Sequence, residues 1–353
     1  MSSSKVLVRV PATSANLGPG YDALGLALDL HDEVEAALCD EPGDGPRATS
    51  TRIEVEGEGA GELDDGEGHL IVTTMRTAFD RMGVPQPRGI RLRCVNRIPH
   101  ARGLGSSSAA ICAGILAARA LAVPYAARAD PHAVGEHGGR REGPASGEGV
   151  TSYSTGTSGE ALAAGAELLS DDEVFALANE LEGHPDNVAP CLSGGLTIAW
   201  LDHDGRPGKV RLNPHEGIRP VVCIPRQRLS TEHARGLLPK DVPHSDAAAN
   251  AGRAALLVAA LTQRPDPRLL LAATEDRLHQ NYRAPAMPQT MDLVKLLRAK
   301  GLPAVVSGAG PTVLVFATAN TQDLIAPEVG NDWLIQPLNV DPVGSFVQFP
   351  ETR

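Results

Sequence analysis

Aromatic residues are scarce in this chain of 353 residues, which has five Phe, four Tyr and two Trp. A hydrophobic core must therefore be aliphatic, filled mainly by Ala, Val and Leu. The length exceeds the size at which single cores usually stop growing, so we expect two lobes.

Cysteine is also rare, and the five cysteines show no CxxC spacing and are odd in number. This pattern excludes a disulfide framework and fits reduced thiols that pack in the interior.

A basic excess and long apolar runs are missing too. The formal net charge of -11 argues against non-specific binding to nucleic acid or to an anionic membrane. No apolar run approaches membrane-spanning length, and residues 1–5 lead into a short strand without an apolar signal core. We expect a cytoplasmic protein whose anion sites are local.

A glycine- and serine-rich loop, PHARGLGSSSAA at residues 99–110, precedes an apolar, alanine-rich segment of helical spacing at residues 111–121. Gly103 and Gly105 can adopt backbone angles closed to other residues, and they place no Cβ beside a ligand. We therefore expect a branched side chain at Gly105 to prevent phosphate binding without disrupting the fold. Serines follow at helix N-cap positions, where free amides and the helix dipole favour an anion. No lysine follows, which excludes a Walker A loop. A serine-capped helix after a flexible turn remains the alternative.

The remaining pattern mixes strands and helices without regular alternation, which predicts an α+β fold. We expect strands at residues 6–10 (ending at Pro11), 52–56, 89–96, 194–201, 220–224, 304–307 and 312–316, and helices at 70–82, 170–183, 245–263, 268–280 and 291–300. Residues 126–166 hold almost no large apolar side chain, so we expect an exposed, mobile insertion whose His132 and His137 are solvated.

Three further segments accompany the loop: PATSANLGPGYD at residues 11–22, EGHPDNVAP at 182–190 and SGAGPT at 307–312. In this order, the four motifs resemble those of the GHMP kinases, and the first and third resemble the homoserine kinases among them. The resemblance implies two lobes, a domain at residues 1–205 like the second domain of a ribosomal small-subunit protein and a ferredoxin-like domain at 206–353. It also implies ATP and Mg²⁺ as cofactors, L-homoserine as the acceptor in threonine biosynthesis, and a possible homodimer.

The resemblance assigns roles to residues as well. The nucleotide would contact Pro99, His100, Ala101, Arg102, Gly103, Leu104, Gly105, Ser106, Ser107, Ser108 and Ala109. The acceptor would contact Asn16, Asp22, His184, Asp186, Arg235 and Arg283. Asp22 would take its ammonium and the two arginines its carboxylate, which a forked guanidinium suits.

Two roles stay open at this stage. Magnesium would be held by Ser107, Glu182 and Thr231, with Glu180 as the fallback glutamate. Asp186 stands where related kinases place a catalytic aspartate, and Asn187 could orient the hydroxyl instead. The alternatives are a GHMP kinase for another small alcohol, such as a mevalonate-type substrate, and a catalytically dead binding protein of the same fold.

Overall fold

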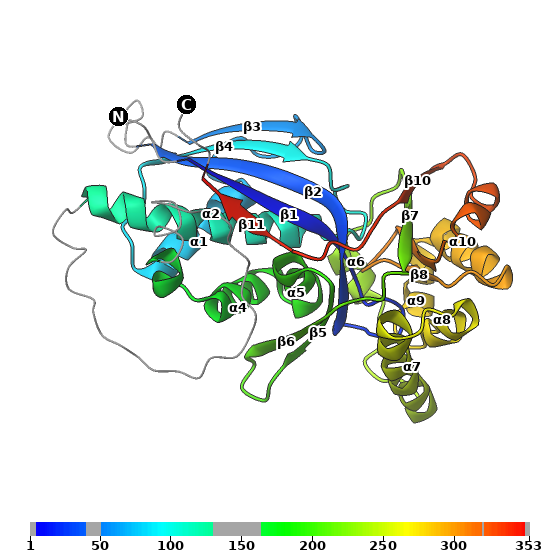
Figure 1. Ribbon diagram of the computed structural model, residues 1–353. Coiled ribbons are helices and arrows are strands. Elements are labelled where there is room, and N and C mark those ends of the chain that lie inside the picture. Colours follow the sequence, from blue (N-terminus) through cyan, green and yellow to red (C-terminus); the bar gives the residue numbers. More distant parts are fainter. Residues whose placement is uncertain (1–4, 40–50, 130–163, 320, 350–353) are drawn as a thin grey trace.

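The computed structural model describes residues 5–39, 51–129, 164–319 and 321–349, and these form two lobes, each built on one sheet (Figure 1). The first sheet has the strand order β11-β1-β2-β4-β3, and β5 extends it by pairing with β2 and β6. Its strands are β1 (Lys5–Ala15), β2 (Leu24–Cys39), β3 (Arg52–Gly57), β4 (Gly89–Asn96), β5 (Leu196–Leu201), β6 (Pro207–Leu212) and β11 (Phe346–Gln348).

Helices cover one face of this sheet: α1 (Leu70–Met82), α2 (Ser106–Ala129), α4 (Asp171–Glu182) and α5 (Pro185–Ser193) (Figure 1). Helix α2 packs against α1 and β1, and most of its side chains are buried. Ser106–Tyr125 is apolar and long enough to cross a membrane, so the expectation that no such run exists is wrong, but 78% of that window is buried inside the protein. By its burial, α2 is a core helix.

The second lobe is built on an antiparallel sheet of order β10-β7-β9-β8. Its strands are β7 (Arg219–Pro225), β8 (Ala304–Val306), β9 (Val313–Ala317) and β10 (Trp333–Pro337). Its helices are α6 (Thr231–Gly236), α7 (His244–Thr262), α8 (Pro267–Ala273), α9 (Gln280–Arg283) and α10 (Pro288–Ala299), with short 3₁₀ turns at η2 (Ala284–Ala286), η3 (Gln322–Leu324) and η4 (Ala326–Glu328).

The α+β class, the two-lobed arrangement and the aliphatic core are confirmed, since buried Val, Leu, Ile and Ala dominate the core and Phe79, Phe175 and Phe316 are its buried aromatic side chains in the described ranges. The division at residue 205 stays a prediction. Strands β6 and β11 both join the first sheet, so the last strand in the described part of the chain returns to the lobe that contains β1.

Two local expectations are wrong. Strand β1 continues past Pro11 to Ala15, because a register shift between Pro11 and Ala12 accommodates the proline. The helix expected at 268–280 is broken: α8 ends at Ala273, and the carboxylate of Asp276 accepts from the amides of the next residues and starts α9.

The expected insertion falls mainly on residues 130–163, which lie outside the described residues, as do His132 and His137. The described ends of this stretch are helical, with α2 continuing to Ala129 and a short helix at residues 164–168.

Candidate active site

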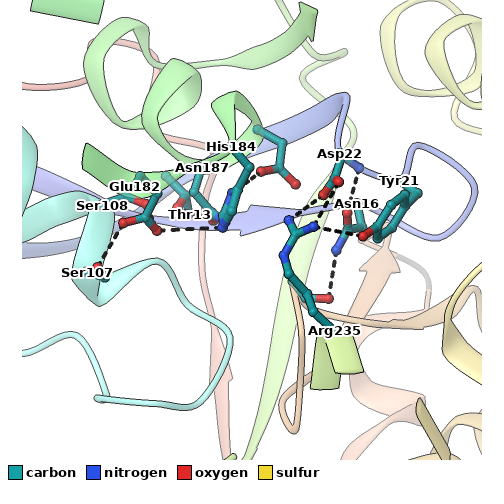
Figure 2. Close-up of polar contacts among 12 residues, drawn as sticks. Thr13, Asn16, Tyr21, Asp22, Ser107, Ser108, Glu182, His184, Asn187 and Arg235 are labelled. Carbon is teal, nitrogen blue, oxygen red and sulfur yellow. Dashed lines mark hydrogen bonds and ion pairs between the residues drawn. The ribbon is translucent and has the colours of Figure 1, made fainter. Parts of the chain in front are cut away.

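A cavity of about 250 Å³ collects residues from all four motifs. Its lining is Asn16, Ala101, Gly103, Gly105, Ser106, Ser107, Glu182, His184, Asp186, Asn187, Leu229, Ser230, Thr231, Arg235, Arg283, Gly308 and Ala309. Of the residues expected to contact the acceptor or the metal, only Asp22 is missing from this lining, and it is bound to Arg235, which does line the cavity (Figure 2).

The loop lies between β4 and α2, as the motif requires, and Ala101, Gly103 and Gly105 have φ values of 54°, 75° and 73°. A Cβ on Gly105 would lie 2.0 Å from Thr13 Oγ1, and one on Gly103 would lie 2.2 Å from the Ser307 carbonyl oxygen. The two glycines therefore let the loop pack closely against Thr13 of the first motif and Ser307 of the last motif. This contact argues against the expectation that a branched residue at Gly105 spares the fold, which stays a prediction.

The eleven loop residues expected to bind nucleotide take different places. Ala101, Gly103, Gly105, Ser106 and Ser107 line this cavity. His100 and Ala109 line a second cavity described below, Pro99, Leu104 and Ser108 are buried, and Arg102 lines neither cavity.

The side chain of Arg102 lines neither cavity and donates to backbone carbonyls. Its Nε donates to the Pro225 carbonyl at 3.0 Å and its Nη2 to the Arg226 carbonyl at 3.1 Å. Arg102 thus ties the loop to the end of β7 in the second lobe.

Glu182, the last residue of α4, accepts hydrogen bonds from two loop serines (Figure 2). Ser107 Oγ donates to Oε2 at 2.8 Å and Ser108 Oγ to Oε1 at 2.7 Å. Helix α4 ends here because Gly183 takes a left-handed φ of 88°, which turns the chain into the third motif. The fallback Glu180 lies elsewhere, in an exposed ion pair with Arg81 at 2.7 Å. Ser107 and Glu182 together offer the hard oxygen ligands that Mg²⁺ prefers.

His184 and Asp186 form a close pair, with Nδ1 2.6 Å from Oδ1, and Asp186 is only 1% exposed. Burial lowers the pKa of His184, but the hydrogen bond and charge of Asp186 outweigh it and raise that pKa overall. The Asp186 carboxylate is therefore already engaged by a cationic or proton-sharing partner.

Asn187 is fixed by Thr13, whose hydroxyl donates to Oδ1 at 2.8 Å. Within the described ranges its Nδ2 has no hydrogen-bond partner, and the residue lines the cavity. Asn187 can therefore donate to a ligand oxygen.

Asn16 and Asp22 bracket a tight turn in the first motif, with φ values of 68° and 52°. Asn16 Oδ1 accepts from the Asp22 amide at 2.9 Å, and its Nδ2 donates to the Gly308 carbonyl at 2.8 Å. Asp22 and Arg235 were expected to meet opposite charges of the acceptor, but here Arg235 forks onto both Asp22 oxygens at 2.7 and 3.0 Å.

Arg283 is 1% exposed and has no carboxylate partner among the described residues. Its Nη1 lies 3.2 Å from His279 Nδ1 and 3.3 Å from the Gly308 carbonyl, while its Nε is buried without a partner. Burial lowers the pKa of Arg283, and the neighbouring cation Arg235 lowers it further. A buried cation with an unmatched donor is suited to an anionic ligand.

Sequence reasoning missed four residues that shape this site: Thr13, Tyr21, His279 and Gly308. Three of them, Thr13, Tyr21 and Gly308, lie inside the quoted motifs. His279 had a usable signal, since it stands four residues before Arg283, a spacing that faces one side of a helix.

A second cavity, of about 340 Å³, lies on the other side of the loop and shares Ser106 and Ser107 with the first. Apolar side chains line it, including Leu63, Leu70, Ile71, Ala109 and Ala110, together with His69, Asn96, His100 and the acids Asp32 and Asp64. Asp32 Oδ1 accepts from the amides of Arg97 at 2.6 Å and Ile98 at 2.9 Å. Burial raises the pKa of Asp32 to about 6.

Residues 69–149 match the GHMP kinases N terminal domain, and residues 257–335 match the GHMP kinases C terminal domain. The homoserine kinase of Streptomyces coelicolor is 49% identical over 345 residues, which cover 98% of this chain and 95% of that protein. A crystal structure of homoserine kinase from Cytophaga hutchinsonii superposes with a TM-score of 0.71 at 24% identity, covering 99% of this chain and 98% of that one. A mevalonate diphosphate decarboxylase from Enterococcus faecalis also shares the fold, with a TM-score of 0.62 at 13% identity and coverage of 99% and 100%.

Proposed function

Because this chain belongs to the homoserine kinases within the GHMP kinase family, we propose that it transfers the terminal phosphoryl group of ATP to the hydroxyl of L-homoserine. The product, O-phospho-L-homoserine, would enter threonine biosynthesis in the cytoplasm. One observation carries the proposal: a single cavity joins a glycine loop at a helix N-terminus to a carboxylate and to two arginines. Phosphoryl transfer needs this combination of positioning and charge.

The triphosphate of ATP fits the loop, because the first amides of α2 have no partners within the helix and the helix dipole is positive there. The second cavity suits the nucleoside, because apolar side chains line it and it shares Ser106 and Ser107 with the first cavity. The base would then lie among Leu63, Leu70 and Ala110.

Magnesium fits the oxygens of Ser107 and Glu182, and Thr231 lines the same cavity. When bound, the ion would neutralise charge on the phosphate oxygens. Without the ion, Glu182 still orients the hydroxyls of Ser107 and Ser108 at the start of α2.

An α-amino acid carries the charges that Asp22, Arg235 and Arg283 complement. Its carboxylate would meet the two guanidinium groups and its ammonium Asp22, while Asn16 keeps Asp22 in place through the backbone amide. Its hydroxyl would then face His184, Asp186 and Asn187 on the wall nearest the loop. We assign orientation of that hydroxyl to Asn187. Asp186, which is already paired with His184, would remove the proton only if that pair opens.

A coupled assay of ADP release tests this function with homoserine, serine, threonine and mevalonate at saturating ATP and Mg²⁺. Homoserine should be phosphorylated far better than an alcohol lacking its amino or carboxylate group, because unpaired buried polar groups discriminate strongly. Equal turnover of mevalonate would contradict the substrate assignment. Sedimentation of the same protein tests the expected homodimer.

Two matched substitutions test the division between the cavities. Ala110 and Ala309 are both half-buried and line the second and first cavity respectively. Ala110→Phe should raise the KM for ATP and leave that for homoserine unchanged, whereas Ala309→Val should do the reverse. A rise of the same constant in both variants would show that the two cavities are not separate subsites.

A further inference from the structure

Tyr21 is placed next to both arginines of the first cavity, although it carries no charge and is absent from the cavity lining. Its hydroxyl accepts from Arg235 Nη1 at 2.9 Å, and the Arg235 Cζ lies 5.8 Å from the ring centroid (Figure 2). The Cζ of Arg283 lies 5.4 Å from the same centroid. One side chain therefore contacts two guanidinium groups that come from different helices, α6 and α9.

Arg235 and Arg283 converge on one site, where two cations repel each other. They differ in whether a carboxylate neutralises them. Asp22 neutralises Arg235 with a forked ion pair. Arg283 has no such partner in the described ranges, and it is buried. A ring face within about 6 Å of a cation attracts it through the ring quadrupole. The Tyr21 ring supplies this attraction without bringing a charge that an incoming carboxylate would have to displace.

The Tyr21 ring also packs against the ring of His279. The two ring centroids are 5.3 Å apart at an interplanar angle of 36°. His279 is fully buried, burial lowers its pKa, and its Nε2 lies 2.8 Å from the Gly18 carbonyl. A neutral ring that donates to this carbonyl through Nε2 leaves Nδ1 as the acceptor for Arg283 Nη1. Tyr21 thus lies beside both arginines, and the neutral ring of His279 packs against Tyr21 and accepts from Arg283.

The Tyr21 hydroxyl also stays protonated. Burial, and then the charge of Asp22, raise the pKa of Tyr21. A neutral hydroxyl can accept from Arg235 and still leaves the cation its full charge.

We propose that Tyr21 is a positioning residue for the acceptor: it sets the spacing of Arg235 and Arg283 so that both guanidinium groups can bind one carboxylate. This inference rests on the proposed function, because it requires an acceptor that carries a carboxylate. It concerns the acceptor, since Tyr21 contacts Arg235, Arg283 and His279 in the described ranges.

Two substitutions at Tyr21 separate its ring from its hydroxyl. Tyr21→Phe keeps the ring and loses the hydrogen bond to Arg235, so the KM for homoserine should rise about three- to tenfold. Tyr21→Leu also removes the ring from both cations, and the rise should be larger, about tenfold or more beyond that of the Phe variant. The KM for ATP should stay unchanged in both. Tyr282→Phe is a matched control: it makes the same chemical change beside Arg283, on a half-buried tyrosine, and should change neither constant.

A purely structural role predicts another outcome, in which Tyr21→Leu lowers the melting temperature and the active fraction while the KM for homoserine per folded molecule stays as in the wild type. That result would overturn the inference, and so would equal rises for homoserine and ATP. The stabilisation of each variant by added homoserine in thermal unfolding gives a second readout that needs no turnover. If the wild type neither phosphorylates homoserine nor is stabilised by it, the proposed function fails before any Tyr21 variant is compared.

Discussion

Arg235 holds both carboxylate oxygens of Asp22, at 2.7 and 3.0 Å, across 213 residues of sequence. Each of these side chains has a charge that the acceptor is proposed to meet. A zwitterionic amino acid can take over both contacts at once, because its ammonium can bind Asp22 while its carboxylate binds Arg235. A ligand with only one charge would leave one side chain of the pair unmatched.

We first predict that Arg235→Ala and Arg283→Ala each raise the KM for homoserine and leave that for ATP nearly unchanged. Losing one partner of a desolvated charged pair typically costs about 2–5 kcal/mol. The two variants should differ with 3-amino-1-propanol, which is homoserine without its carboxylate. Arg235→Ala frees Asp22 and should improve binding of this amine, whereas Arg283→Ala leaves the Asp22 pair closed and should not. A change in the ATP constant alone would make that arginine a nucleotide ligand.

The sequence predicted the members of this site better than their partners. The first motif located Asp22, and the family resemblance located Arg235 and Arg283, which lie outside the four motifs. Nothing local shows that Asp22 and Arg235 face each other, or that Arg283 is buried beside Tyr21, since these contacts depend on how α6 and α9 pack on the turn of the first motif.

The fold shows the same division. Periodicity predicted α1 and the helix that ends at Gly183, where caps and apolar spacing agree. It missed α5, because Pro185 and Pro190 resemble a loop in sequence, although a proline at the first turn of a helix loses no hydrogen bond. It also missed β11, whose three residues pair with β1 only after the chain has crossed the whole molecule.

A second prediction concerns Glu182 and magnesium. Glu182→Gln keeps a similar shape but removes the charge beside Ser107. We expect the Mg²⁺ concentration for half-maximal turnover to rise about tenfold or more, as for a lost carboxylate ligand to a hard cation. Glu180→Gln is the matched control two residues earlier on α4, where the side chain pairs with Arg81 on the surface. Equal effects of the two substitutions would show that Glu182 acts only through the charge or stability of the helix.

The third prediction is a pH dependence of stability from Asp32. Its pKa is about 6 in the folded protein against an ordinary 3.8. The folded state therefore binds the proton more tightly than the unfolded state, and the protein loses stability as the pH rises between these two values. Asp32→Asn keeps an oxygen for the amides of Arg97 and Ile98 but has no proton to lose.

The free energy of unfolding of Asp32→Asn, relative to the wild type, should therefore increase from pH 4 to pH 7. The increase should be at most about 3 kcal/mol, since one pKa unit corresponds to about 1.36 kcal/mol. Urea unfolding at several pH values measures this difference, in which the other titrating groups cancel. A flat difference would mean that Asp32 is not desolvated in the folded protein.

The last prediction separates the two glycines of the loop. A Cβ on Gly105 would meet the Thr13 hydroxyl at 2.0 Å, whereas one on Gly103 would meet the Ser307 backbone oxygen at 2.2 Å. Both substitutions to Ala should lower stability and ATP affinity, because both positions also have a positive φ, which costs a non-glycine residue about 1–2 kcal/mol.

Thr13→Ala should relieve the contact at Gly105 and leave the one at Gly103, since it removes a side-chain oxygen and cannot move Ser307. The double variant Gly105→Ala with Thr13→Ala should therefore be more stable than the sum of its single changes by about 1 kcal/mol or more, the range of coupling between residues in contact. Gly103→Ala with Thr13→Ala should be additive. Urea unfolding and binding of a non-hydrolysable ATP analogue measure both cycles, and additivity at Gly105 would show that the loop can move away from Thr13 without cost.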